Sequence, residues 1–187
     1  RAGVPGWPLI PAPVRIVLGV LALWLAWLAV VQARILGINF LLSVLTLVWV
    51  ADIFAYFAGR AFGLRFTRNK LAPSISPGKS WEGVWGGLAG VLCLAVAWVA
   101  ADRYFQADVA SFYTRLYSAG WWFLAIAVVF MVAMSVAGDL VESLIKRSAG
   151  VKDSSGLLPG HGGVLDRVDA LLPTLPLALM LTRLISV

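Results

Sequence analysis

The chain has 187 residues, of which 61% are hydrophobic and only 13% are charged. This composition excludes an ordinary water-soluble domain and a disordered chain, and the single cysteine excludes a disulfide-rich scaffold. A net charge of +6 would suggest nucleic acid as the partner of a soluble protein. In a membrane protein, basic residues beside the spans usually fix the topology, so we expect membrane lipids and no nucleic acid as partners.

The apolar residues form five blocks of roughly 20 residues, the length that crosses about 30 Å of hydrocarbon. The predicted spans, in chain order, are Val14–Ile35, Ile38–Arg60, Glu82–Ala101, Trp121–Lys146 and Val164–Val187. The expected fold is an all-α, polytopic transmembrane bundle of about five helices, which form a single membrane domain over residues 1–187. Because Arg1 opens a Gly-Pro-rich stretch, we expect the C-terminal part of a longer polytopic protein.

Antiparallel order places the loops Arg60–Ser80 and Arg147–Gly163 on one side of the membrane. These loops hold most of the clustered Lys and Arg residues, so the positive-inside rule predicts that they face the cytoplasm. We therefore expect a multi-pass protein of the cell (inner) membrane whose cytoplasmic loops form the site. On the opposite side, Asp102 and Asp108 are expected to be solvated loop acids.

Two spans carry residues that affect helix packing. Glycines in the third span form small-x-x-x-small pairs, which are typical of closely packed helices; these are Gly83, Gly86, Gly87 and Gly90. In the last span, Pro173 and Pro176 each remove a backbone donor, so we expect a bend or a break there, beside a polar cavity.

Acidic residues within or at the ends of spans are costly, so they are usually paired, face a wet cavity or hold a cation. The chain has five of them: Asp52, Asp139, Glu142, Asp166 and Asp169. Helical periodicity places Asp139, Glu142, Ser143, Lys146 and Arg147 on one polar stripe. Antiparallel order brings the acids of three helix ends to one membrane surface, where they can converge. A structural ion-pair stripe and a hydrogen-bonded Asp52 are simpler alternatives.

Both basic loops suit the binding of an anion. Residues 148–163 contain five glycines, Lys152 and several hydroxyls, and glycine lets backbone N–H groups point inward. The other loop supplies Lys70, Ser76, Lys79 and Ser80. Carboxylates that bind Mg²⁺, with lysines and amides around the remaining oxygens, are what a phosphate chain requires. The pattern indicates phosphoryl or nucleotidyl transfer, whereas a flexible turn is the simpler explanation of the glycines.

Two blocks of motifs lie between about Leu47 and Pro176. The C-terminal block contains Ser143-Leu-Ile-Lys-Arg147, Lys152-Asp153, Leu158-Pro-Gly-His-Gly-Gly163 and Leu165-Asp-Arg-Val-Asp169. The middle block contains Trp49-Val-Ala-Asp52, Ala55-Tyr56-Phe57, Gly59, Lys70-Leu-Ala-Pro73 and Ser76-Pro-Gly-Lys-Ser-Trp-Glu-Gly83. In order and spacing they resemble the phosphatidate cytidylyltransferases, also called CDP-diglyceride synthases. Ile53 and Phe54 stand where that family more often has a small hydroxyl residue and a glycine, and Ala170 replaces a frequent serine.

The resemblance implies an enzyme of phospholipid biosynthesis that converts CTP and phosphatidate to CDP-diacylglycerol and pyrophosphate. It implies Asp139, Asp166 and Asp169 as ligands of Mg²⁺, with K⁺ as a companion ion. It also implies a set of phosphate-contacting and substrate-binding residues, which comprises Lys152, Asp153, His161, Arg167, Lys70, Ser76 and Lys79. Lys146 and Arg147 would hold the phosphatidate head group. A homodimer is a further implication of the family.

Three alternatives are weighed against this interpretation. A CDP-alcohol phosphotransferase is disfavoured because its Asp-Gly-x-x-Ala-Arg motif is absent from the sequence. A CTP-dependent polyprenol or dolichol kinase is chemically closer. A cation transporter or channel would hold its acids near the bilayer midplane, whereas these acids are expected at helix ends.

Overall fold

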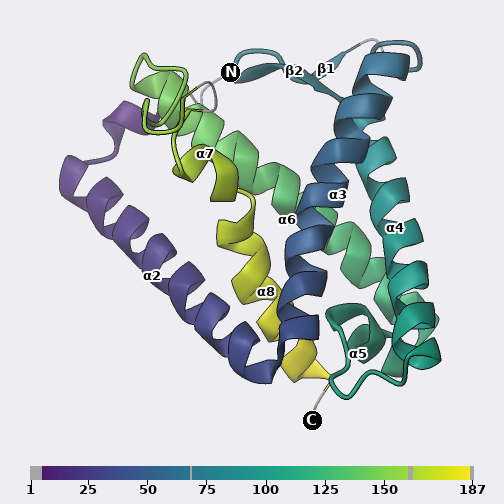
Figure 1. The fold of residues 1–187 in the computed structure, drawn as a ribbon. Helices are drawn as coiled ribbons and strands as arrows, with labels where there is room; N and C mark the ends of the chain where they lie inside the picture. Colours follow the sequence, from purple (N-terminus) through teal and green to yellow (C-terminus); the bar gives the residue numbers. More distant parts are fainter. Residues whose placement is uncertain (1–5, 68, 160–161, 186–187) are drawn as a thin grey trace.

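The computed structural model describes residues 6–67, 69–159 and 162–185. This part of the chain is a helical bundle with one small hairpin, which confirms the predicted all-α class (Figure 1). The elements in chain order are η1 Trp7–Leu9, α2 Ala12–Leu36, α3 Ile38–Phe62, β1 Lys70–Ala72, β2 Ser76–Ser80, α4 Trp81–Tyr104, α5 Phe112–Ser118, α6 Trp121–Ser148, α7 Leu165–Val168 and α8 Leu171–Leu184.

Four helices, α2, α3, α4 and α6, are long and apolar enough to cross a membrane, and they match the first four predicted spans. The fifth span, Val164–Val187, is wrong as one uninterrupted helix, because α7 ends at Val168 and α8 begins at Leu171, although Asp169 and Ala170 between them keep helical dihedral angles. Pro173 has no N–H to donate to the carbonyl of Asp169, which accepts from the Leu172 amide at 3.3 Å instead, and this lost i→i−4 bond explains the position of the interruption. With 14 residues, α8 is about 21 Å long, shorter than the hydrocarbon core.

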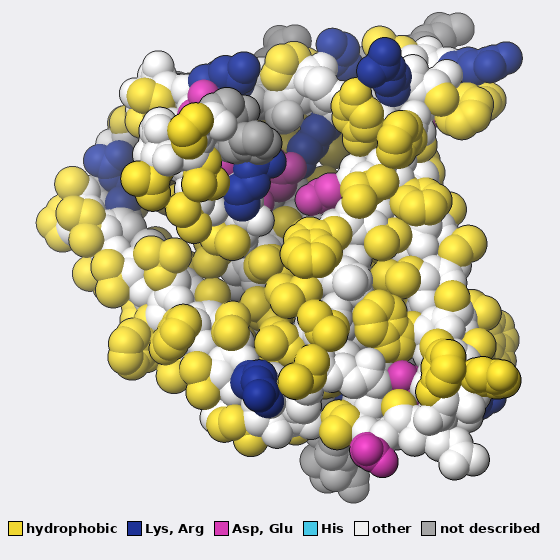
Figure 2. Space-filling view, in the orientation of Figure 1, with side chains coloured by type: hydrophobic (Ala, Val, Ile, Leu, Met, Phe, Trp, Pro, Cys, Tyr) yellow, Lys and Arg dark blue, Asp and Glu magenta, His cyan; other side chains and the backbone are white. Residues whose placement is uncertain are grey.

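The two basic loops lie at the same end of the bundle, as antiparallel order predicts (Figure 1). One loop contains the β1–β2 hairpin, in which Lys70 pairs with Ser80 and Ala72 with Ser76. The other runs from the end of α6 to α7. The turn between α2 and α3, α5 and the end of α8 lie at the opposite end. Figure 2 shows Lys and Arg side chains gathered around the loop end, with acidic side chains in the hollow beneath them.

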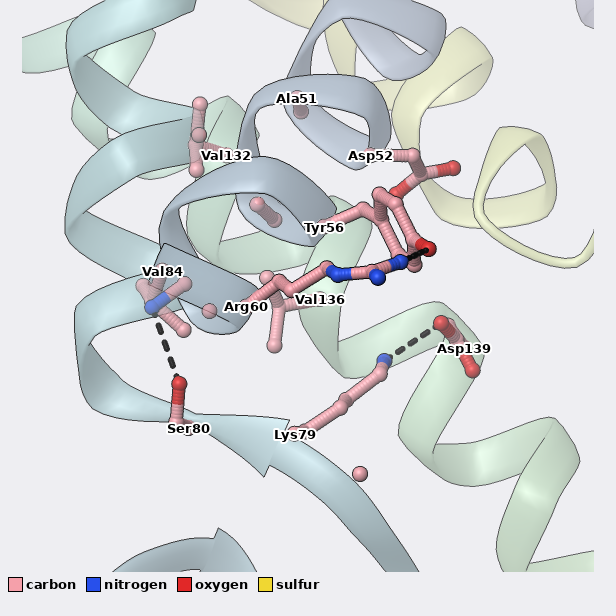
Figure 3. Close-up of a pocket in the computed structure, with 15 residues that line it drawn as sticks. Ala51, Asp52, Tyr56, Arg60, Lys79, Ser80, Val84, Val132, Val136 and Asp139 are labelled. Atoms are coloured by element: carbon pink, nitrogen blue, oxygen red, sulfur yellow. Dashed lines mark hydrogen bonds and ion pairs between the residues drawn. The ribbon is translucent and has the colours of Figure 1, made fainter. Parts of the chain in front are cut away.

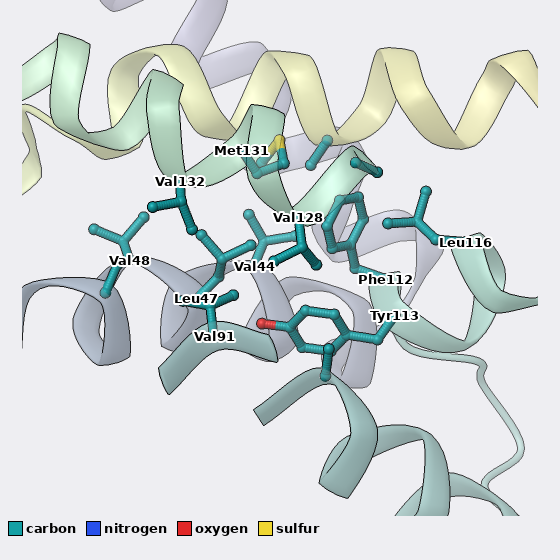
Figure 4. Close-up of a cluster of buried hydrophobic side chains, with 14 of the residues drawn as sticks. Val44, Leu47, Val48, Val91, Phe112, Tyr113, Leu116, Val128, Met131 and Val132 are labelled. Carbon is teal, nitrogen blue, oxygen red and sulfur yellow. The ribbon is translucent and has the colours of Figure 1, made fainter. Parts of the chain in front are cut away.

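The apolar core lies away from the basic loops, where α5 inserts between α3, α4 and α6 (Figure 4). Phe112, Tyr113 and Leu116 of α5 are fully buried. Asp102 is not the solvated acid that we expected: its carboxylate accepts hydrogen bonds from Asn39 Nδ2 (2.8 Å), the Ser111 amide (3.0 Å) and the Thr114 hydroxyl (2.5 Å). Asn39 belongs to α3, and Ser111 and Thr114 belong to α5 and its N-cap, so Asp102 of α4 ties α5 to the start of α3 and the end of α4.

The glycines of the third span allow α3 and α4 to approach closely, as predicted. A Cβ added at Gly87 would lie 2.8 Å from the carbonyl oxygen of Ala51, and one at Gly83 would lie 3.0 Å from that of Ala55. Added carbons at Gly86 and Gly90 would meet the side chains of Ala58 and Phe54. These contacts hold α3 at a fixed distance from α4, and both helices carry residues of the site described below.

A matched pair of substitutions tests the α3–α4 contact. We expect Gly87→Ala to destabilise the protein by about 1–3 kcal/mol, because its methyl group must displace backbone. In Gly19→Ala on α2, the added carbon meets nothing within 4 Å, so this variant should keep or slightly raise the stability. Thermal unfolding in detergent measures both variants. Equal melting temperatures would contradict the close-contact interpretation.

Candidate active site

A cavity of about 390 Å³ lies between α3, β2, α4 and α6; we call it the polar cavity (Figure 3). Its polar lining consists of Asp52, Tyr56, Arg60, Lys79, Ser80 and Asp139. The remaining lining residues are Gly, Ala and Val. The small residues of the α3–α4 contact therefore leave room beside them for polar groups from three elements.

Lys79 on β2 and Asp139 on α6 meet across the polar cavity. The distance between Lys79 Nζ and Asp139 Oδ2 is 2.5 Å, and about a quarter and a third of the two side chains are exposed. Asp139 also accepts a hydrogen bond from Ser143 Oγ at 3.2 Å. The hairpin thus carries a lysine to a carboxylate nine residues before the end of α6, about 14 Å along the helix.

Two further carboxylates lie within electrostatic range of this pair. Asp52 on α3 interacts with Asp139, Lys79 and Asp169. Asp169 follows α7, and an added Cβ at Gly138 would lie 2.9 Å from its carbonyl oxygen, so the chain at residue 169 touches α6. Burial, and then the neighbouring Asp139 carboxylate, raise the pKa of Asp169 to about 6. Three acids from three elements therefore face one lysine.

The face of α3 that lines the polar cavity carries a stripe at four-residue spacing: Asp52, Tyr56 and Arg60. Arg60 donates a hydrogen bond from Nη1 to the Tyr56 hydroxyl at 3.0 Å. Arg60 was not among the predicted site residues, although its i, i+4, i+8 relation to Asp52 was visible in the sequence. Asp52 lies ten residues before the end of α3, so it is about 15 Å deeper than the helix end.

Asp166 on α7 has a separate set of partners. It accepts hydrogen bonds from the amides of Gly163 (2.6 Å) and Ser154 (2.9 Å) and from the Ser154 hydroxyl (2.8 Å), and it pairs with Lys146 Nζ at 2.5 Å. Burial opposes the ionisation of Asp166, but Lys146 and the loop donors outweigh it and hold the pKa of its carboxyl well below the ordinary value. The glycine-rich loop is thus wrapped around a carboxylate of the protein itself.

Lys146 joins this second centre to α6. Its ammonium lies 2.5 Å from both Asp166 Oδ1 and Glu142 Oε2, so one lysine compensates two acids. Arg147, on the next position, donates from Nε to the carbonyl oxygen of Ile75 at 3.4 Å and so links α6 to the hairpin. The simpler alternative for the polar stripe of α6 was a structural ion pair. Such a pair is present within the stripe, between Glu142 and Lys146.

The other predicted substrate contacts are spread along the two loops. Lys70 is exposed at the start of β1, and Ser76 is half-buried at the start of β2. Lys152 and Asp153 are exposed in the loop that wraps Asp166, and Arg167 is exposed on α7. His161 lies outside the described residues. Of these side chains, none lines the polar cavity within the part of the chain that the structure describes.

The acids suit a hard cation that is shared with phosphate oxygens. Within residues 6–67, 69–159 and 162–185, no three Asp, Glu, His or Cys side chains form a preassembled metal cluster. Mg²⁺ does not require one, because it commonly takes one or two carboxylates and completes its octahedron with water and substrate phosphates. Asp139 and Asp169, whose carboxylates repel each other, are two residues that could serve as such oxygen ligands.

The contacts of Asp166 predict that it orders the loop in the absence of any ligand. Asp166→Asn keeps the shape of the side chain but weakens the Lys146 ion pair and three hydrogen bonds to the carboxylate. Limited trypsin digestion should then cleave after Lys152 roughly tenfold faster. Asp139→Asn, which removes the same charge from the polar cavity, is the control and should leave this cleavage rate unchanged. Equal cleavage rates for wild type and Asp166→Asn would contradict the prediction that Asp166 orders the loop.

Comparison with known proteins places this arrangement in a family. Residues 11–185 match the model of the cytidylyltransferase family. A phosphatidate cytidylyltransferase of Haemophilus influenzae is 51% identical over 140 residues, which are 75% of this chain and 44% of the relative. Those of Pseudomonas aeruginosa and Thermotoga maritima are 46% and 40% identical over 87% and 78% of this chain, and 55% and 49% of the relatives. The chain spans about half the length of these curated relatives. The chain belongs to the cytidylyltransferase family.

Proposed function

We propose that this chain carries the active site of a membrane enzyme that joins CTP to phosphatidate, giving CDP-diacylglycerol and pyrophosphate. The observation that carries the proposal is the group of Asp52, Asp139 and Asp169 around Lys79, at the end of the bundle that bears both basic loops. Family membership and the names of the relatives support the same reaction. Family membership also favours an enzyme over a transporter, although Asp52 and Asp139 lie about 14–15 Å deeper than the helix ends where these acids were expected.

In this proposal Asp139 and Asp169 hold Mg²⁺, and Asp52 supplies a third nearby carboxylate, with K⁺ as a companion ion. The cation would neutralise phosphate oxygens and withdraw charge from the reacting phosphorus. Asp166 was predicted as a third ligand, and that role stays a prediction. Its four present contacts favour a positioning role, in which it holds the glycine-rich loop against α6.

The Lys79–Asp139 ion pair gives both partners a role when a triphosphate binds. Lys79 can turn from Asp139 to the phosphate oxygens, while Asp139 becomes available to the cation, so both charges stay compensated. An oxygen of the lipid phosphate then forms a bond to the α-phosphorus in line with the leaving group. The bond from that phosphorus to the bridging oxygen breaks, and pyrophosphate leaves with the electron pair. The phosphate attacks as an anion, so no general base is required.

The loops supply the remaining charge in this proposal. Lys152, His161 and Arg167 on one loop, and Lys70 and Ser76 on the other, would contact phosphates, with Asp153 among the substrate-binding residues. Arg147 and Lys146 would hold the lipid head group. The basic loop end supports an orientation toward the cytoplasm, in the inner membrane of the cell. The homodimer implied by the family stays a prediction.

The cation role of Asp139 predicts the behaviour of Asp139→Asn in the full-length enzyme. Transfer of CMP from CTP to phosphatidate should fall by on the order of 10²-fold or more, because the amide cannot compensate the cation. Transfer of α-³²P label into lipid at saturating Mg²⁺ measures this effect. Ser143→Ala, which removes only a hydrogen-bond donor to Asp139, is the control and should stay within about threefold of wild type. Near-normal turnover of Asp139→Asn would remove this residue from the site.

Two hairpin lysines are expected to differ in their effects. Lys79→Met should lower kcat/KM for CTP by on the order of 10²-fold, because this lysine lies inside the polar cavity. Lys70→Met removes an exposed lysine of the same hairpin, whose proposed phosphate contact is solvated and lies outside the polar cavity, so kcat/KM should fall by less than about tenfold. Steady-state kinetics with varied CTP concentration compare the two variants. Similar losses in both would show that the hairpin acts through its overall charge.

The labelled nucleotide also separates the proposed reaction from the kinase alternative. A cytidylyltransferase transfers α-³²P into phosphatidate and releases pyrophosphate. A CTP-dependent polyprenol kinase transfers only the γ-phosphate, and to a prenol. Transfer of γ-label to polyprenol, without pyrophosphate release from CTP and phosphatidate, would refute the proposed function.

A further inference from the structure

A second cavity of about 600 Å³ lies between α2 on one side and α6, α7 and α8 on the other; we call it the α2 cleft. Its walls are almost entirely apolar, with Leu18, Met134 and Leu177 among the lining residues. Its only charged lining residues in the part of the chain that the structure describes are Arg15, Glu142 and Asp169. The cleft is thus a hydrophobic space with charges that belong to the loop end of the bundle.

The shape of the cleft follows from a stripe of small residues on α2. Ala26, Ala29 and Ala33 are buried, because here α2 packs tightly against the bundle. On the same face, one and two turns nearer the loop end, Ala22 and Gly19 are exposed, and a Cβ added at Gly19 meets nothing within 4 Å. Figure 1 shows the result: α2 and α8 are close at one end and diverge toward the basic loops.

Arg15 lies at the wide end of the cleft, in the first turns of α2. Its Nε atom is buried and has no hydrogen-bond partner among the described residues. A buried donor of a guanidinium without an acceptor is costly, and the fork of N–H groups matches the oxygens of a phosphate. The wide end of the cleft therefore offers an unused donor to an anionic head group.

The cleft also reaches the proposed site of reaction. Asp169 lines the cleft and interacts electrostatically with Asp139 and Lys79 of the polar cavity. Gly138, next to Asp139, lines the cleft as well. A molecule in the cleft would therefore have one end beside the acids and the other between apolar helices.

We propose that the α2 cleft binds one acyl chain of the lipid substrate beside Gly19 and Ala22, so that the phosphate of the lipid lies near Asp169 and Arg15. Arg15 then adds a contact to the head group beside Lys146, whose partner Glu142 lines the cleft. This inference rests on the proposed function and adds to it the place where the lipid lies. Because lipid tails are as apolar as the helices, transfer of the chain from bilayer to cleft provides little hydrophobic free energy. The cleft instead orients the phosphate for attack on the nucleotide, which is where positioning has large kinetic effects.

Gly19→Phe in the full-length enzyme tests the inference, because it fills the cleft where the structure has open space. We expect kcat/KM for dioleoyl phosphatidate to fall roughly tenfold or more, while KM for CTP stays unchanged. Dibutyryl phosphatidate, whose chains end before Gly19, should be affected much less. Val20→Phe is the control, because it adds the same ring at the neighbouring position, which does not line the cleft. It should keep wild-type kinetics.

A second measurement identifies the occupant without relying on turnover. Phosphatidate with a photoreactive diazirine in its acyl chain should label α2, α6 or α8 in the wild type, and Gly19→Phe should lose this labelling. Equal lipid kinetics for Gly19→Phe and Val20→Phe, together with unchanged labelling, would overturn the inference. A lower melting temperature of Gly19→Phe, together with a lower kcat/KM for both dioleoyl and dibutyryl phosphatidate, would also overturn the inference. That result would indicate that a protein segment occupies the cleft. A wild-type enzyme that does not convert CTP and phosphatidate would instead refute the proposed function.

Discussion

The organisation of the loop end depends on the cost of ionised carboxylates between apolar helices. Each acid there needs a compensating charge or several hydrogen-bond donors, and the chain provides these from outside the long helices. Lys79 reaches Asp139 from the hairpin, and the glycine-rich loop closes around Asp166 with the help of Lys146. The two loops are therefore held in place by the acids, and charge compensation rather than a packed core gives this end of the protein its shape.

The opposite end shows the same rule in a structural setting. Asp102 is compensated by Asn39, Ser111 and Thr114 without any cation, and these contacts seat α5 in the core. Fully satisfied carboxylates of this kind have no capacity for a ligand. Asp52 and Asp139 of the polar cavity differ, because they share one lysine with the nearby Asp169 and the three acids repel one another. Acids are present at both ends of the bundle. The candidate site differs from the Asp102 network because the negative charges of its acids are only partly compensated.

Length and hydropathy were sufficient to predict four helices, their antiparallel order and the common end of the two basic loops. The hairpin was not predictable, because Ser76-Pro-Gly-Lys-Ser80 has no alternating apolar pattern, and the seven-residue α5 is too short to show a helical period. The acids were found because carboxylates are rare in apolar blocks. Arg15 and Arg60 were missed for the opposite reason: arginine beside a span usually marks topology, and only the structure shows which arginines line a cavity.

The break between α7 and α8 connects these observations. Asp166 and Asp169 are three residues apart, and the backbone between α7 and α8 stays helical in its dihedral angles. Pro173 has no N–H for the carbonyl of Asp169, so helical hydrogen bonding is interrupted there, and the two acids have different neighbours: Asp166 binds the loop and Lys146, while Asp169 lies against α6 beside Asp139. The interruption thus lies beside the acid that lines the α2 cleft, whereas the acid that holds the loop belongs to α7.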